Sequence, residues 1–307
     1  MTKAEILVVG GTGYIGSNLI PCLLESSVSV RCLVRKKKQD ENRVKDSVEV
    51  VYGDLLEPES LSPACRGIDT AFYLAHSLDK KENFEKAEYK SAENFAAAAQ
   101  SAGVKRIIFL GALGRDQEGP LSPHLKSRKE VGNILRNSGI TVIEFQASII
   151  LGSGSLSYEM IKALSERLPV MILPRWTDVK SQPIGVRDVL DYLIQAIDLK
   201  TNGNEIFEIG GPDQVSYKDL ITEYSRLAGL KRWLIPVPVL TPWLSSLWLS
   251  LVTPLYARVG RRLIESIKTS TVVHNNQART AFPGIKPLGI TQSLEFALRK
   301  GHPISEN

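Results

Sequence analysis

The sequence contains few of the residues that build metal sites and disulfide frameworks. Its 307 residues include only three cysteines and four histidines. No two cysteines are spaced as C-x-x-C, an odd number cannot all pair within one chain, and the histidines show no ligand spacing. We therefore expect no metal site, no disulfide scaffold and a reduced, cytoplasmic compartment.

No hydrophobic run is long and unbroken enough to predict a membrane span. The first apolar run, residues 6–9, starts too early to leave room for a signal peptide. Residues 233–257 carry no charge, but prolines interrupt them and leave a longest proline-free piece of 11 residues. At about 1.5 Å per residue, that piece spans roughly half of a bilayer core. We expect a buried or amphipathic element, with peripheral contact to a membrane surface as the alternative.

The charge is too diffuse to indicate nucleic-acid binding. The formal net charge is +5, and the one dense basic run is Arg35 to Lys38. A mild positive excess suits an anionic small ligand. The expected partners are therefore a small-molecule substrate or a protein, with the oligomeric state left open.

Apolar runs of strand length alternate with helical patterns over the first two-thirds of the chain. The predicted strands are 6–9, 28–34, 48–51, 70–75, 106–110, 141–145 and 206–209. The predicted helices are 14–25, 83–102, 122–137, 158–167 and 186–197. This alternation predicts an α/β fold with a Rossmann-type, doubly wound parallel sheet.

A glycine-rich turn follows the first predicted strand and opens the first helix. Its glycines have the spacing G-x-x-G-x-x-G, which permits a tight turn, backbone approach to a pyrophosphate and close helix–sheet packing. The helix N-terminus favours negative charge. The turn predicts a nicotinamide dinucleotide site, with a purely structural turn as the alternative. Its residues are Gly10, Gly11, Thr12, Gly13, Tyr14, Ile15 and Gly16.

The end of the second strand indicates which nucleotide binds. An NAD enzyme usually places Asp or Glu here for the ribose 2′-hydroxyl, but this chain has Arg35 followed by Lys36. A guanidinium binds a 2′-phosphate through charge-assisted hydrogen bonds, so the sequence favours NADP(H) over NAD(H). Asp54 and Leu55, after the third strand, are placed to meet the adenine, although Asp54 could equally cap its own loop.

The pattern changes after residue 150, and no polar linker marks the boundary. We expect residues 1–150, completed by about 184–210, to form the NAD(P)-binding Rossmann domain. Residues 151–183 and 211–307 would then form a smaller, mostly helical substrate lobe.

Six stretches carry a family resemblance: residues 10–16, 53–55, 71–77, 103–106, 182–189 and 207–211. Together they resemble the extended short-chain dehydrogenase/reductases, and within them the atypical, NmrA-like branch. Residues 124–130, 166–171, 174–176 and 236–242 resemble bacterial NAD(P)H-binding proteins of the nucleoside-diphosphate-sugar epimerase-like type. The resemblance covers essentially the whole chain. It implies a Rossmann domain, a C-terminal substrate lobe and a Ser/Thr–Tyr-x-x-x-Lys active site.

The sequence departs from that active-site pattern. The hydroxyl expected after the fifth strand is absent, and the best match to Tyr-x-x-x-Lys is His124-x-x-x-Arg128. Arginine stays protonated and could still bind ribose hydroxyls, and a neutral His124 could act as a general base. The alternative for His124 is a surface histidine near a helix start.

Other candidates lie at predicted strand ends. Ala75, His76 and Ser77 end the fourth strand, near where a nicotinamide ribose would lie, although His76 could equally be a satisfied polar group at the sheet edge. Gln146 and Ser148 follow the sixth strand and could line a substrate cleft.

The sequence thus predicts an NADP(H)-binding atypical reductase that acts on a fairly apolar small molecule. The apolar residues 233–257 motivate the choice of substrate. The missing Ser–Tyr–Lys set keeps a non-catalytic redox sensor or assembly factor as the alternative. A sugar-nucleotide epimerase is disfavoured because it needs the absent tyrosine.

Overall fold

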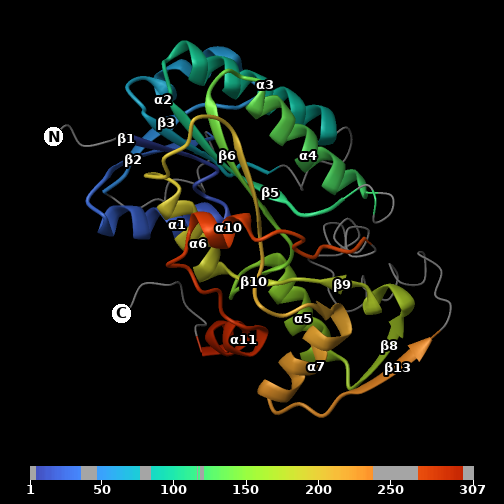
Figure 1. Ribbon diagram of the computed structural model, residues 1–307. Helices are drawn as coiled ribbons and strands as arrows, with labels where there is room; N and C mark the ends of the chain where they lie inside the picture. Colours follow the sequence, from blue (N-terminus) through green and yellow to red (C-terminus); the bar gives the residue numbers. More distant parts are fainter. Residues whose placement is uncertain are drawn as a thin grey trace.

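The computed structural model describes residues 5–35, 47–76, 84–115, 117, 121–237 and 269–299. A seven-stranded parallel sheet lies between two layers of helices, and a smaller lobe follows it (Figure 1). The sheet order is β11-β6-β5-β4-β1-β2-β3. Its strands are β1 (Glu5–Val9), β2 (Ser29–Val34), β3 (Glu49–Tyr52), β4 (Thr70–Tyr73), β5 (Arg106–Ala112), β6 (Thr141–Ala147) and β11 (Glu205–Ile209). The predicted doubly wound parallel sheet is confirmed.

Each face of the sheet is covered because the parallel strands alternate apolar side chains to both sides. On β1, Ile6 and Val8 face one buried cluster and Leu7 and Val9 face the other. Helices α1 (Tyr14–Glu25), α6 (Val186–Gln195) and α10 (Gln277–Ala281) cover the first face. Helices α2 (Ser62–Cys65), α3 (Phe84–Ser101) and α4 (Pro123–Arg136) cover the second.

Helix α4 begins where the sequence predicts, and for the predicted reason. Ser122 is its N-cap, and the Ser122 side chain accepts a hydrogen bond from the Leu125 amide at 3.2 Å. Pro123 occupies the first turn, where its missing N–H costs nothing. Gly139, with φ +79°, follows the helix end. This start fixes His124 and Arg128 on the first turns of the helix.

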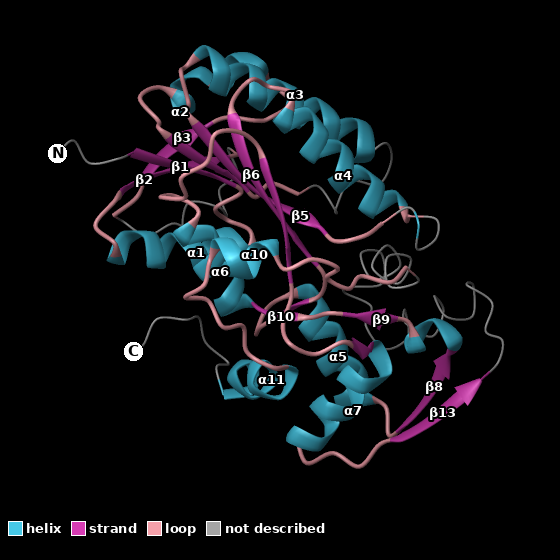
Figure 2. Cartoon of the chain, in the orientation of Figure 1, coloured by secondary structure: helices cyan, strands magenta, loops and turns pink. Residues whose placement is uncertain are grey.

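The smaller lobe combines helices with two-stranded ribbons (Figure 2). Helices α5 (Leu156–Arg167), α7 (Tyr217–Leu227) and α11 (Ile290–Arg299) share its buried core. The ribbons pair β7 (Ile150–Leu151) with β10 (Ile184–Gly185), β9 (Lys180–Ser181) with β12 (Val215–Ser216), and β8 (Val170–Pro174) with β13 (Trp233–Val237). Short 3-10 turns lie at Pro58–Ser60 and Arg175–Asp178.

The two regions share elements rather than meeting at a single chain crossing. β11 pairs with β6 and extends the main sheet, and α6 packs against α1. The segment 269–276 then returns from the C-terminal part of the chain, where Thr271 bridges to Ser181. Among the described residues, no helix is both long and apolar enough to cross a membrane.

Candidate functional site

The glycine-rich turn lies at the carboxyl end of β1, directly beside the end of β4. Gly10 has φ +90°, a conformation that side chains rarely tolerate. A Cβ at Gly10 would also lie 2.7 Å from the Leu74 carbonyl carbon and from the Ala75 nitrogen. Gly10 therefore permits both the turn and the close approach to the chain that leaves β4.

The remaining glycines shape the start of α1. A Cβ at Gly16 would meet the Gly11 Cα at 2.6 Å, so Gly16 lets the helix lie against the turn. Gly13 is the N-cap, is exposed, and its amide donates to the Gly10 carbonyl at 3.0 Å. No side chain caps the helix. The positive end of α1 thus lies at the carboxyl edge of the sheet, and its first turn contains no acidic residue.

The other turn residues contribute mainly through the backbone. Gly11 is buried against Cys32, Ile15 packs on the core beneath α1, and Thr12 is half-buried. The Tyr14 ring lies against Gly154, near the start of the smaller lobe, and burial raises the pKa of the Tyr14 hydroxyl. Tyr14 therefore links the turn to the lobe.

The residues expected near the adenosine lie at the ends of β2 and β3. Arg35 follows β2 directly and is exposed. The Asp54 carboxylate accepts a hydrogen bond from the Leu56 amide at 2.9 Å, so it does cap its own loop. The Leu55 carbonyl accepts from the Asn94 amide at 2.8 Å. Lys36 and Ser77 lie outside the described residues.

A buried carboxylate organises the polar groups at the end of β4. His76 Nδ1 lies 2.8 Å from Glu88 Oε1, and the Ser127 hydroxyl donates to Glu88 Oε2 at 2.5 Å. Glu88 and Ser127 are both buried. Burial alone would raise the pKa of Glu88, but His76, Arg128 and Ser127 outweigh that effect and hold the pKa well below its ordinary value. Glu88 is therefore a carboxylate in the folded protein.

His124 and Arg128, one helical turn apart on α4, occupy different environments. The His124 ring stacks on the His76 ring, with centroids 4.9 Å apart. Arg128 is 5% exposed, and its guanidinium donates to the Ala75 carbonyl at 3.3 Å and the Leu110 carbonyl at 2.6 Å. It also lies 4.7 Å from the Phe109 ring centroid. Arg128 thus braces the ends of β4 and β5, which leaves little of it open to a ligand.

Gln146 and Ser148 are committed to protein contacts. The Gln146 amide donates to Glu144 at 2.8 Å, and Glu144 in turn pairs with Arg136. The Ser148 and Thr271 hydroxyls lie 2.5 Å apart, which holds the returning C-terminal segment at the end of β6.

The structure brings together the glycine turn, Ala75, His76, His124 and Arg128. Gln146 and Ser148 instead bond to Glu144 and Thr271. Sequence reasoning missed Glu88 and Ser127. A signal for Glu88 was present, since it shares a helical spacing with the buried Ala92, Phe95 and Ala99. A carboxylate on an apolar helix face needs a partner.

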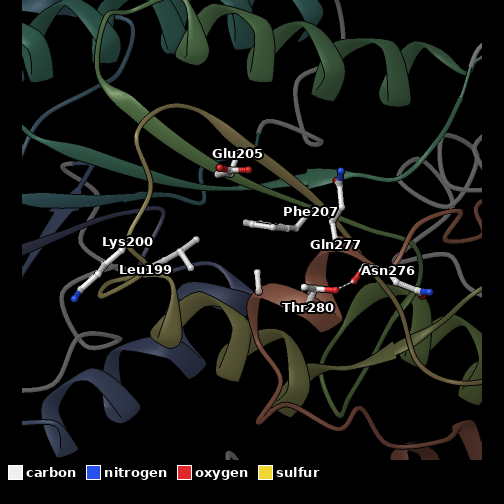
Figure 3. Close-up of a pocket in the computed structure, with 8 residues that line it drawn as sticks. Leu199, Lys200, Glu205, Phe207, Asn276, Gln277 and Thr280 are labelled. Atoms are coloured by element: carbon white, nitrogen blue, oxygen red, sulfur yellow. Dashed lines mark hydrogen bonds between the residues drawn. The ribbon is translucent and has the colours of Figure 1, made fainter.

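A separate hollow of about 580 Å³ lies beside β11, an edge strand of the sheet. Figure 3 shows Glu205 and Phe207 of β11 facing side chains of α10 and the segment before it, among them Asn276, Gln277 and Thr280. It contains none of the predicted site residues and lies on edge strand β11, away from the glycine turn.

Known proteins resemble the chain over most of its length. It is 24% identical to the photosystem II assembly factor Ycf39 of Cyanophora paradoxa, over 76% of this chain and 72% of that protein. It is 25% identical to the NAD(P)H azoreductase of Xenophilus azovorans, over 73% of this chain and 74% of the relative. The triphenylmethane reductase of Citrobacter sp. complexed with NADP(H) has the same fold, with a TM-score of 0.75, 17% identity and coverage of 95% and 99%. The model of the NmrA-like family matches residues 2–241, so the chain belongs to the NmrA-like family.

Proposed function

We propose that the chain binds a nicotinamide dinucleotide across the carboxyl ends of β1, β2 and β4, and prefers NADP(H). The observation that carries the proposal is the uncapped start of α1 beside Gly10, Gly13 and Gly16. Backbone N–H groups and the helix dipole there suit a diphosphate. The azoreductase and the NADP(H) complex of the triphenylmethane reductase support the same ligand class.

Arg35 supports the preference for the phosphorylated nucleotide. It is exposed and directly follows β2, where NAD-specific proteins place a carboxylate. The Asp54 carboxylate stands one strand further on and already accepts a backbone hydrogen bond. The local charge at the end of β2 therefore favours a 2′-phosphate.

A bound nicotinamide supplies a hydride, and the protein must then supply or relay a proton. The carboxylate of Glu88 faces His76 Nδ1 at 2.8 Å, so that ring nitrogen carries a proton. His124 lies stacked on the same ring. We assign proton handling to this pair and a positioning role to Glu88, Ser127 and Arg128.

We further propose that residues 151–183 and 211–307 hold the substrate, with residues 1–150 and about 184–210 holding the nucleotide. Tyr14 and Ser148 already join the two parts through Gly154 and Thr271. The substrate class that fits best is a fairly apolar acceptor of one hydride and one proton, such as a quinone or enone.

Calorimetry with NADPH and NADH tests the cofactor assignment. Arg35→Ala should weaken NADPH binding at least tenfold, about 1.4 kcal/mol, and leave NADH binding nearly unchanged. Arg66→Ala is the matched control, because Arg66 is also exposed but follows α2, away from the end of β2. Equal losses for both nucleotides would show that Arg35 does not read the phosphate.

Turnover is tested by NADPH oxidation with a panel of ketones, enones and quinones. We expect at least one acceptor to be reduced, with His76→Asn and His124→Phe slowing the reaction while NADPH binding persists. Tight NADPH binding without any oxidation above background would contradict the enzyme assignment.

The second candidate is a non-catalytic sensor or assembly factor, in which nucleotide occupancy changes a surface for a protein partner. The likeness to the assembly factor Ycf39 and the missing Ser–Tyr–Lys set favour it. It predicts that His124→Ala preserves the biological activity while Gly13→Val abolishes it. Equal loss from both changes would reject it.

A further inference from the structure

The ribbon formed by β8 and β13 exposes an unusual apolar face. Four of its large side chains are far more open than core residues: Val170 is 49% exposed, Ile172 41%, Trp233 73% and Ile235 47%. In the parallel register Trp233 lies opposite Val170 and Ile235 opposite Ile172. Partners in register share a face of the ribbon, so the four side chains form one patch, which we call the ribbon face.

The opposite side of the same ribbon explains why it folds. Met171 and Leu173 are buried, and both pack in the core of the smaller lobe with α5 and α7. Strand β8 therefore carries apolar side chains on both of its faces, of which one face is buried and the other is exposed. A strand that only needed to cover the lobe would place polar residues outward.

The surroundings of the ribbon face are positively charged. Neither β8 nor β13 contains a charged residue. Arg167 and Lys231, just before the two strands, and Arg175, just after β8, are exposed. Two carboxylates lie nearby: Glu166 accepts a hydrogen bond from the Tyr224 hydroxyl, and Asp178 ends the 3-10 turn. Among the described residues that flank the two strands, cations thus outnumber carboxylates around an apolar, tryptophan-bearing patch.

From this chemistry we propose that the ribbon face docks on the surface of an anionic lipid bilayer. Tryptophan is favoured at the boundary between headgroups and acyl chains, and Lys and Arg are attracted to anionic headgroups. Figures 1 and 2 show β8 and β13 at the outer side of the smaller lobe, on the side away from the main sheet. The sequence that follows β13 contains no charged residue up to residue 257, so this stretch adds no negative charge. This inference is independent of the proposed function.

Vesicle co-sedimentation of the full chain tests it. We expect binding to vesicles of phosphatidylcholine mixed with phosphatidylglycerol, little binding to phosphatidylcholine alone, and weakening by salt. The double variant Trp233→Ser/Ile235→Ser should reduce binding at least about tenfold, and Lys231→Glu/Arg175→Glu should do so on anionic vesicles. Ile206→Ser and Lys286→Glu are the matched controls, because Ile206 is 39% exposed on β11 and Lys286 is exposed near α10.

Two further readouts keep the test decisive. All variants should keep the wild-type unfolding midpoint and NADPH affinity, so a folding defect or failure of the nucleotide site is recognised separately. No binding of folded wild-type protein to anionic vesicles would overturn the proposal. Binding that survives Trp233→Ser/Ile235→Ser would overturn it too, as would a dimer, seen by analytical ultracentrifugation, that this variant dissociates.

Discussion

His76 and His124 stack face to face at the junction of β4 and α4, with ring centroids 4.9 Å apart and ring planes 9° apart. Glu88 holds the first ring by its Nδ1 atom, and Ser127 holds Glu88 from the same helix that carries His124. One buried carboxylate therefore holds the His76 ring on which His124 stacks. A substitution at Glu88 should therefore alter the position of His124 through the stacked His76 ring, without direct contact between Glu88 and His124.

Glu88→Gln is expected to lower the free energy of unfolding by about 1–3 kcal/mol at neutral pH, because a buried charge-assisted network loses its charge. The folded-state pKa of Glu88 lies below its unfolded value, so its contribution is present above the ordinary carboxyl range and is lost on acidification. Urea unfolding should thus show the gap between wild type and variant closing as the pH falls below about 4. Glu93→Gln, exposed on the same helix, is the control. An equal gap at every pH would contradict this account.

The glycine turn makes a graded prediction. Gly10→Ala should destabilise the fold, because the added Cβ meets the Leu74–Ala75 backbone at a positive φ. Gly13→Val should leave the fold largely intact, because Gly13 is exposed and its nearest contact is the Gly10 carbonyl at 3.2 Å. It should nevertheless abolish nucleotide binding by obstructing the approach to α1.

Thermal unfolding and calorimetry check both glycine variants. Gly203→Ala, with no atom within 4 Å of the added Cβ, is the control and should change neither property. Retained nucleotide affinity in a folded Gly13→Val protein would show that the diphosphate lies elsewhere.

Regular periodicity carried most of the predicted fold. The strands and helices of the main sheet have long apolar patterns, and the glycine turn and the start of α4 have local residue signals. The ribbons of the smaller lobe were not predicted, because several of their strands contain only two residues. Their pairing also joins segments that are far apart in the sequence, such as 180–181 with 215–216. Strands that short have no period to read.

The site was predictable only where one local motif defines it. The glycine turn is contiguous, whereas the His76–Glu88–Ser127 network joins a strand end to two helices. Contact of Arg128 with the nucleotide stays a prediction, and in the structure its guanidinium donates to the carbonyls of Ala75 and Leu110. The sequence spacing placed Arg128 one turn after His124 on α4. The carbonyls to which Arg128 donates depend on tertiary packing, which the spacing does not reveal.

A buried carboxyl in α6 predicts a second pH effect. Burial raises the pKa of Asp188 to about 6, although the Leu288 amide donates to it at 3.1 Å. The folded state therefore holds this proton more tightly than the unfolded state, so the Asp188 contribution to stability falls as pH rises from about 4 to about 6.

Asp188→Asn keeps the acceptor for Leu288 and removes the charge. As the pH rises from acid to neutral, the free energy of unfolding of the variant should increase by up to about 2–3 kcal/mol relative to that of the wild type. Urea unfolding across this pH range measures the difference. Asp198→Asn, at an exposed position just after the same helix, should leave the pH profile unchanged. A wild-type slope that persists in Asp188→Asn would assign the effect to another group.

Arg128 offers the sharpest separation of a positioning role from direct contact with the nucleotide. Arg128→Met removes the donors to Ala75 and Leu110 and the cation beside Glu88, so it should cost about 2–4 kcal/mol of unfolding free energy. Arg128→Lys should cost less, because one ammonium keeps the charge but cannot reach both carbonyls as a planar guanidinium does. Arg187→Met, on an exposed position of α6, is the control.

Because the Arg128 side chain donates to the protein itself, folded Arg128→Lys should bind NADPH with nearly wild-type affinity in calorimetry. The folding cost and the affinity are separate measurements, so the two roles cannot be confused. A tenfold loss of NADPH affinity at unchanged stability would show that Arg128 contacts the nucleotide directly, and that the bonds to the strand ends break when it binds.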